Sequence, residues 1–558
     1  MTGSGLRAAC GIVAAGLTLG VAELVAVPVG AGSAPLAAIG STVVDRTPDR
    51  VREWAIDTFG TNDKLVLFVC MGVVAAAVAA LAGRIERTDR PFGSAVLAVF
   101  GLVAAFVAAN RPGASWTWAL PSLVGVVLGI MVLRWSIRRC EQVAPGRDGV
   151  PARPRAAPGV GGRPRDDVVA APGASRATSA GHAASGTRDS ADGPAASDGS
   201  AGALDRRQAV RGIVGVGILA AATGLAGRLL GARAHSVSSE RAAVQLPLPN
   251  VAAPPIDPAA DLRIPGITPY LTSNADFYRI DTALVVPQVS TDTWSLRIHG
   301  MVEREIRLGY ADLMRRPAVE RLVTLACVSN PIGGDLIGNA RWLGYRLDEL
   351  LAEARPHPDA DMVLSRSVDG FTAGSPLATF IDGRDALLAV GMNGEPLPVA
   401  HGYPARLVVP GLYGYVSATK WVTELEITRF DRAQAYWTKR GWSAHGPIKT
   451  GTRIDTPRSG ARVSGGRVVV AGVAWAQHRG IRAVEVQIDD GPWESARLAA
   501  EPTIDTWRQW SYDWAATPGP HTLRARSTDA TGRTQTSEVR DVIPDGATGY
   551  PTVSVRVG

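Results

Sequence analysis

The chain has 558 residues, which is too long for one ordinary domain, so its length predicts several structural units. Its formal net charge of +7 is spread over linkers and the ends of apolar segments, with no basic face that carries interleaved aromatic residues, which argues against nucleic-acid binding. The four cysteines, at positions 10, 70, 140 and 327, form no CxxC pair and no closely spaced set, so neither a zinc site nor a disulfide framework is indicated.

Four near-continuous apolar runs come first, and each is long enough for a helix to cross a bilayer. They cover residues 6–29, 64–83, 92–109 and 118–135. The first run could be a cleaved signal peptide, but it is long and three more runs follow it. We therefore predict a four-helix transmembrane region over residues 1–142, with an amphipathic helix at the membrane surface over residues 49–59.

Basic residues in the short loops predict the orientation of these helices. Two clusters of three arginines lie between the second and third runs and after the fourth: Arg84, Arg87 and Arg90, and Arg134, Arg138 and Arg139. Because short cytoplasmic loops are enriched in Lys and Arg, both clusters and the N-terminus are expected in the cytoplasm. The loop after the first run also carries three arginines, on the opposite side: Arg46, Arg50 and Arg52.

Residues 143–203 contain no Leu, Ile, Met, Phe, Tyr or Trp, so they cannot bury enough apolar surface to offset the entropy of ordering. We predict a disordered cytoplasmic linker over residues 143–205. An apolar run at 212–230 then predicts a fifth transmembrane helix over residues 206–231. Arg206 and Arg207 before it resemble a twin-arginine export signal, and ordinary positive-inside anchoring explains them equally well. Both interpretations carry the chain outward.

An extended, proline-rich spacer is predicted over residues 232–265. Composition then changes to that of an α+β domain over 266–445, with strands at 294–299, 405–410 and 420–428, a helix at 348–354 and a hairpin at 387–399 that turns at Asn393-Gly394. Residues 446–558 have a purely β pattern, with strands at 467–473, 483–489, 507–515, 521–527 and 538–543. This spacing is typical of an immunoglobulin-like β-sandwich.

Cys327 is the one cysteine outside the predicted membrane region. A β-prone run at 322–325 precedes it and a loop rich in Gly and Asn follows, which is how a strand end presents one side chain to a ligand. Its thiolate could bind a soft metal or act as a nucleophile, and an inert buried thiol is the common alternative. Further on, Arg406 and Lys420 suit a phosphate group, although ion pairing on a sheet surface would also explain them.

Two ordered motifs resemble the sulfite oxidase superfamily of molybdopterin-dependent oxidoreductases. They read LACVSN…GGDLIGNARWLG from residue 325 and HGYPARLVVPGLYG…KW from residue 401, and the resemblance extends from about residue 267 to the C-terminus. It implies a molybdenum–molybdopterin cofactor (Moco) with Cys327 as the protein ligand of the metal. It also implies a set of residues along the pterin and its phosphate: Asn274, Phe277, Arg279, His401, Arg406 and Lys420. The C-terminal β region resembles the family's dimerisation module, so a homodimer is expected.

Two positions depart from the family members that oxidise sulfite. Those members have Arg-Asn-His where this chain has Arg-Ile-Asp at 279–281, and they have a tyrosine after a Trp-x-x-Arg run that is followed here by Gly-Trp. The expected catalytic residues are therefore Cys327, Arg279, Asp281 and Trp442, and the substrate, sulfite or an S- or N-oxide, stays open.

The resemblance implies a membrane-anchored, extracytoplasmic enzyme that transfers an oxygen atom between the metal and a small substrate. All eight histidines lie at or after His182, so the first four predicted helices cannot ligate a bis-His haem, and a separate redox partner, a cytochrome or a quinone-linked protein, is expected. The alternative from another class is a catalytically silent receptor or scaffold that keeps the fold and uses its β region for binding.

Overall fold

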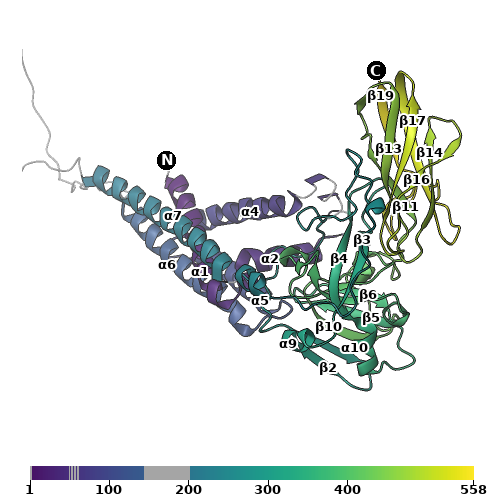
Figure 1. Cartoon of the computed structure of the whole chain (residues 1–558). Helices are drawn as coiled ribbons and strands as arrows, with labels where there is room; N and C mark the ends of the chain where they lie inside the picture. The colour runs from purple at the N-terminus through teal and green to yellow at the C-terminus, as the bar shows by residue number, and fades with distance from the viewer. Residues whose placement is uncertain are drawn as a thin grey trace, which may run out of the picture.

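A computed structural model describes residues 3–48, 51, 54–55, 58–59, 62–143, 201–234 and 236–558. A helical region, a mixed α/β region and a C-terminal β region follow one another along the chain (Figure 1). The predicted linker lies almost entirely outside the described residues, as does much of the predicted amphipathic helix at 49–59.

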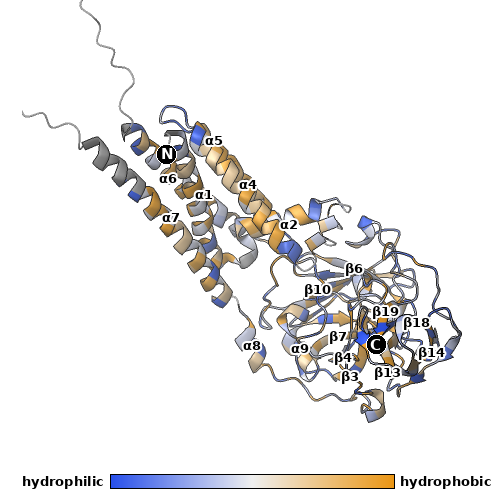
Figure 2. Cartoon of the chain, turned by 90° about the horizontal axis from the view of Figure 1, so that it is seen from above, coloured by the Kyte–Doolittle hydropathy of each residue, from blue (hydrophilic) through white to orange (hydrophobic). Residues whose placement is uncertain are grey.

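The prediction of five apolar helices is confirmed. Within the described residues, five helices are long and apolar enough to cross a membrane. These are α1 (Gly3–Val29), α4 (Asp63–Ile85), α5 (Phe92–Ala109), α6 (Leu120–Val143) and α7 (Ala201–Ala234). A shorter helix, α2 (Pro35–Arg46), lies between α1 and α4. Apolar residues dominate the long helices, whereas the other two regions mix apolar and polar residues (Figure 2).

Glycine residues let α1 lie directly against two other helices. A Cβ on Gly20 would come within 2.6 Å of the carbonyl oxygen of Ala220 in α7, and one on Gly11 within 2.0 Å of the carbonyl oxygen of Ala79 in α4. Close backbone contact at small residues is the usual way in which membrane helices pack. The fifth helix is thus an integral part of the bundle.

Two five-stranded sheets form the α/β region. In the first, the order is β2-β1-β10-β5-β6, with β1 and β10 parallel; in the second, β3-β4-β7-β8 are antiparallel and β9 also pairs with β7. The strands are β1 (Ser295–Gly300), β2 (Ile306–Gly309), β3 (Val319–Ala326), β4 (Ile337–Arg346), β5 (Met362–Ser367), β6 (Thr372–Pro376), β7 (Leu387–Met392), β8 (Glu395–Pro396), β9 (Arg406–Val408) and β10 (Val422–Thr428). The short helices are α8 (Ser238–Ala243), α9 (Tyr310–Met314), α10 (Leu347–Ala354), α11 (Ala378–Ile381) and α12 (Gly414–Ser417).

The predicted hairpin is confirmed because its turn is fixed by local chemistry. Asn393 and Gly394 connect β7 to β8 with φ of 52° and 83°, the two positive values that a type I′ turn requires. The predicted helix at 348–354 and the predicted strands at 294–299, 405–410 and 420–428 correspond to α10, β1, β9 and β10.

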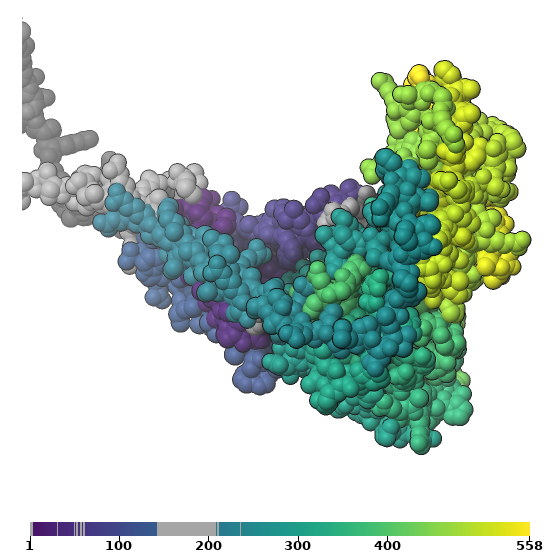
Figure 3. All heavy atoms as spheres, in the orientation of Figure 1, coloured from purple at the N-terminus to yellow at the C-terminus, as the bar shows by residue number. Residues whose placement is uncertain are grey.

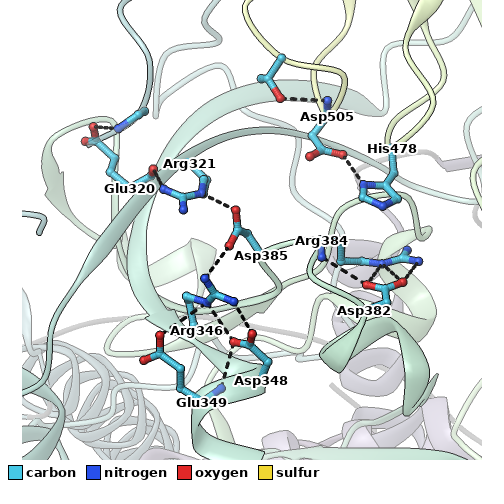
Figure 4. A network of polar contacts seen from close by, with 12 residues as sticks. Glu320, Arg321, Arg346, Asp348, Glu349, Asp382, Arg384, Asp385, His478 and Asp505 are labelled. Atoms are coloured by element: carbon cyan, nitrogen blue, oxygen red, sulfur yellow. Dashed lines mark hydrogen bonds and ion pairs between the residues drawn. The ribbon is translucent and has the colours of Figure 1, made fainter. Parts of the chain in front are cut away.

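A network of charged residues holds the turn before β7 in place (Figure 4). Asp385 accepts a hydrogen bond from Arg321 at 2.7 Å and pairs with Arg346 at 3.6 Å. Arg346 also pairs with Asp348 and Glu349 at the start of α10. Each of these carboxylates faces a cation, so the network ties β3, β4 and α10 together rather than offering an acid–base pair.

Two sheets packed face to face form the C-terminal region. Their orders are β11-β13-β17-β16 and β12-β19-β18-β14-β15, and Val470, Val484, Trp510 and Leu523 share the core between them. The strands are β11 (Gly451–Thr456), β12 (Arg462–Val463), β13 (Gly466–Trp475), β14 (Ile481–Ile488), β15 (Trp493–Ser495), β16 (Arg497–Leu498), β17 (Arg508–Ala516), β18 (Gly519–Asp529) and β19 (Thr552–Val557). Four of the five predicted strands are confirmed.

The strand predicted at 538–543 is wrong. In that stretch a single bridge joins Arg540 to Thr548, and the last strand is β19 instead. β18 pairs with β14 on one side and with β19 on the other, which leaves no free edge of β18 for residues 538–543.

Candidate active site

The loop that carries Cys327 is fixed by the C-terminal region. The hydroxyl of Thr324 in β3 accepts a hydrogen bond from the N–H of Trp507 at 2.8 Å, and the N–H of Thr324 donates to the carbonyl of Asp505 at 2.9 Å. The C-terminal region thus packs against this edge of the α/β region (Figure 3). Since Cys327 directly follows β3, its position is set by both regions.

Hydrogen bonds close the loop of residues 327–336 between β3 and β4. The N–H of Cys327 donates to the carbonyl of Leu336 at 2.9 Å, and the side chain of Asn330 accepts from the N–H of Leu336 at 2.9 Å. Cys327 is buried and free. Burial raises the pKa of its thiol, although hydrogen bonds from Ser329 oppose this, so a positive partner is needed to hold it as a thiolate.

The segment 273–281 lies across the second sheet beside this loop. The ring of Phe277 meets Trp342 edge-on at 5.7 Å and His401 at 5.6 Å. It lies directly on β4, because a Cβ on Gly338 would come within 2.8 Å of the Phe277 ring. Asn274 ties the same segment to the β7–β8 turn, where its side-chain oxygen accepts from Asn393 at 2.9 Å.

Tyr278 is a site residue that the sequence did not single out. Its ring stacks on Phe277 at 5.2 Å. Burial raises the pKa of its hydroxyl, the negative charge of a Cys327 thiolate raises it further, and Arg406 opposes both. The hydroxyl therefore lies within electrostatic reach of both Cys327 and Arg406. In the sequence, only its position in the middle of the SNADFYRID segment indicated that Tyr278 could belong to the site.

Arg406 is a buried cation that hydrogen-bonds only to neutral groups among the described residues. Its residue is 5% exposed, and none of the described carboxylates pairs with it. Its guanidinium donates to the carbonyl oxygens of His401 at 3.1 Å and of Leu407 and Ala418 at 3.4 Å. It lies 5.1 Å from the centre of the Trp342 ring. Burial lowers the pKa of Arg406 to about 10, so it stays charged at neutral pH. A buried charge without a counter-ion is costly, which favours an anionic ligand here.

Lys420 and Asp281 form a buried ion pair next to Arg406. The side chain of Asp281 is 5% exposed and accepts from Lys420 at 2.8 Å, from Arg279 at 2.8 Å and from Lys64 at 3.2 Å. Burial would raise the pKa of Asp281, but these cations hold it well below its usual range. Three cations thus contact one carboxylate, and Arg406 adds a fourth positive charge close to Lys420, so positive charge is in excess here.

The positive charge also keeps His401 neutral. Burial, followed by Arg406 and Lys420, lowers the pKa of His401 to about 4, and a hydrogen bond with the backbone of Asn274 opposes the shift. Gly402 brings the cations together: with φ of 112°, a Cβ there would lie 3.0 Å from Cβ of Arg406 and 3.2 Å from Cβ of Lys420. Glycine adopts this backbone conformation without strain.

A cavity of about 310 Å³ opens beside the loop of residues 327–336, between the α/β and C-terminal regions. Asn330, Ile332, Tyr413, Lys449 and Arg479 are among its lining residues. Burial raises the pKa of Tyr413 to about 12, and the charge of a nearby Cys327 thiolate adds to this effect. Ala326, the residue before Cys327, also lines the cavity.

The structure brings eight of the nine predicted site residues to this part of the chain, and Trp442 lies in a different environment. Its ring packs against Tyr415 at 5.8 Å and Trp437 at 6.0 Å. In the described structure it shares no hydrogen bond, ion pair or ring contact with Cys327 or His401.

Several known proteins are similar to parts of this chain. Residues 283–437 match the family model described as "Oxidoreductase molybdopterin binding domain". Mitochondrial sulfite oxidase of Rattus norvegicus is 29% identical over 288 residues, which cover 43% of this chain and 52% of that protein, and the Homo sapiens enzyme is 29% identical over 289 residues with the same coverage. The uncharacterized oxidoreductase YuiH of Bacillus subtilis is 31% identical over 153 residues, covering 27% of this chain and 74% of YuiH. Among solved structures, sulfane dehydrogenase SoxCD of Paracoccus pantotrophus aligns with a TM-score of 0.47 and 24% identity, over 52% of this chain and 82% of that chain.

The matched domain and the site define a molybdopterin-binding oxidoreductase. The chain belongs to the sulfite oxidase superfamily, whose members depend on Moco. It spans about half the length of the curated sulfite oxidases that it matches. The residues present fit the cofactor, since a buried free thiol lies near an unpaired arginine and an excess of positive charge that suits a phosphate.

Proposed function

We propose that this chain is a membrane-anchored, extracytoplasmic Moco enzyme that transfers an oxygen atom, with two electrons, to or from a small substrate such as sulfite or an S- or N-oxide. The observation that carries this proposal is the buried Arg406, which pairs with none of the carboxylates in the described part of the chain and lies beside Lys420 and within reach of the Cys327 site. When bound, the cofactor supplies the redox and oxygen-transfer chemistry, and the protein supplies orientation and electrostatics.

Each site residue has a defined role in this proposal. Cys327 binds the metal, and Arg406 and Lys420 hold the pterin phosphate. His401, neutral at physiological pH, hydrogen-bonds the pterin, and Phe277 walls its pocket. Asp281 keeps Lys420 protonated despite its burial, because the carboxylate favours the charged amine.

The substrate approaches through the cavity beside Cys327. A volume of about 310 Å³ accommodates a small oxyanion or a small S- or N-oxide with its water. Arg479 in the cavity wall pairs with the buried Asp529 at 3.0 Å, and Lys449 pairs with Asp545 at 2.8 Å. The cavity wall is therefore polar but largely charge-compensated, which suits a neutral oxide at least as well as a sulfite dianion.

Contacts between the helical and α/β regions support an extracytoplasmic catalytic domain. They come from α2, from the start of α4 and from the loop between α5 and α6, where Pro112 packs against Gly370. The positive-inside pattern assigns all three to the outer face. A reporter fused after Ala203 should be cytoplasmic and one fused after Val244 extracytoplasmic; the reverse pattern would overturn the proposed topology.

The C-terminal region is proposed to be an immunoglobulin-like sandwich that mediates homodimerisation. Its two face-to-face sheets with a common core support this assignment. Light scattering of the detergent-solubilised chain should give the mass of two copies, and a single copy across micromolar concentrations would contradict it. A separate cytochrome or quinone-linked protein is proposed to exchange electrons with the site.

The enzyme proposal is tested by expressing the full chain under conditions that supply Moco. Purified protein should contain about one molybdenum per chain, and it should turn over one substrate class in a screen of sulfite, S-oxides and N-oxides with artificial electron donors and acceptors. The proposal would be refuted if the purified protein bound no molybdenum and turned over none of these compounds.

A further inference from the structure

One side chain of the helical region enters the network around Lys420. Lys64, the second residue of α4, places its amine 2.7 Å from the carbonyl oxygen of Ala283, 3.2 Å from Oδ1 of Asp281 and 3.5 Å from the carbonyl oxygen of Asp281. A lysine amine has three N–H donors and no acceptor. All three donors of Lys64 are thus directed at residues 281–283.

Asp281 connects Lys64 to the cofactor site. Oδ1 accepts from Lys64 at 3.2 Å and from Arg279 at 3.4 Å, while Oδ2 accepts from Lys420 and from Arg279, both at 2.8 Å. The direction in which Asp281 presents its carboxylate to Lys420 therefore depends on the position of the 281–283 backbone. Lys64 fixes that backbone through its two carbonyl contacts.

A second contact shows that residues 281–284 are seated on the helical region. Leu284 packs on α2, where a Cβ on Gly40 would come within 2.9 Å of Cδ1 of Leu284. The neighbouring side chains of Ile280 and Val285 are exposed, at 50% and 45%, so they add little packing to hold this stretch. Lys64 supplies the polar restraint that these residues lack.

We propose that Lys64 is a positioning residue for the cofactor site, acting from the end of a transmembrane helix through Asp281 to hold Lys420 against the pterin phosphate. This inference rests on the proposed function, because it assumes that Lys420 binds the phosphate. It means that the helical region does more than anchor the enzyme: it completes the frame of the cofactor pocket.

The test measures cofactor retention rather than turnover. Full-length variants are purified in detergent, and molybdenum and oxidised pterin are quantified per chain after extended dilution. Lys64→Met should lower retention about fivefold, the size expected for losing charge-assisted hydrogen bonds. Lys64→Arg keeps a cation with several donors and should restore most of it. Should Lys64→Met not accumulate, Lys64→Gln poses the same question.

Three further variants separate the possible outcomes. Arg111→Met is the matched control, since Arg111, just after α5, makes one ion pair of 2.8 Å with Asp45 at the end of α2 and should retain cofactor like the wild type. Lys420→Met is the benchmark for loss of the phosphate contact. In an Asp281→Asn background, Lys64→Met should cost less than twofold, because the carboxylate through which it acts is gone.

Wild-type retention in Lys64→Met, with loss in Lys420→Met, would refute the role of Lys64 and leave the proposed function intact. Wild-type retention in Lys420→Met would instead refute the phosphate site itself, and the inference with it. Equal loss in Arg111→Met, or no rescue by Lys64→Arg, would show that the helical region is merely disrupted and would also overturn the proposal.

Discussion

Replacing Arg406 by Met should have opposite effects on the cofactor-free and the cofactor-loaded protein. Burial lowers the pKa of Arg406 from 12.5 to about 10, which corresponds to about 3 kcal/mol that disfavours the charged side chain in the folded state. The substitution removes this cost, but it also removes the contact over Trp342 and the hydrogen bonds to three carbonyl oxygens, two of them long at 3.4 Å, together about 2 kcal/mol. The cofactor-free variant should therefore be as stable as the wild type, or about 1 kcal/mol more stable.

The loaded protein should respond in the other direction, because the cofactor phosphate then compensates the charge and Arg406 is its strongest partner. We expect Arg406→Met to lose most of its bound molybdenum and with it the stabilisation that a bound cofactor confers. Thermal unfolding of both forms, with molybdenum content measured in parallel, checks the two halves of the prediction.

Arg453→Met is the matched control for this experiment. Arg453 is a buried arginine that does have a carboxylate partner, with Nε lying 2.6 Å from Oδ1 of Asp455. Its loss leaves a buried carboxylate unpaired, so both forms should be destabilised by about 3–5 kcal/mol. If cofactor-free Arg406→Met were destabilised as strongly as Arg453→Met, the argument that Arg406 awaits an anionic ligand would be refuted.

Two further predictions concern the same pocket. Burial lowers the pKa of Lys420 to about 8, so the cofactor-free protein should bind inorganic phosphate more weakly, as measured by calorimetry, when the pH rises through 8. The buried charge of Lys420 lowers the stability of the fold below pH 8, and this cost disappears as the pH rises towards 10.5. A phosphate affinity that is constant from about pH 7 to 9 would contradict the prediction. Gly402→Ala should destabilise the chain by more than about 1 kcal/mol and lower its cofactor content, because φ is 112° and the new Cβ would meet Arg406 and Lys420. A variant that unfolds at the wild-type temperature would contradict this prediction.

Features that depend on local chemistry could be predicted from the sequence. An apolar run of about twenty residues suffices for a membrane helix, and Asn-Gly suffices for a type I′ turn, so all five helices and the hairpin were found. The strand at 538–543 was predicted wrongly because its pattern suits a strand, whereas its pairing depends on an edge that β19 occupies.

Features that depend on distant parts of the chain could not be predicted. Lys64 and Asp281 are 217 positions apart in sequence, and no pattern links the start of an apolar helix to the segment that carries Asp281. Trp442 was selected from its place in a motif, but its packing against Tyr415 and Trp437 depends on tertiary structure. The pairing of Arg279 and Lys420 with one buried carboxylate, that of Asp281, emerges only in three dimensions.

The most direct test of the account is the molybdenum content of the full-length chain with and without the Cys327 thiol. Wild-type protein should contain about one molybdenum per chain and give a paramagnetic molybdenum signal on partial reduction. Cys327→Ser should lose that signal and all turnover while it unfolds at the same temperature as cofactor-free wild type. An unchanged signal and unchanged turnover in Cys327→Ser would contradict the claim that this thiol binds the metal.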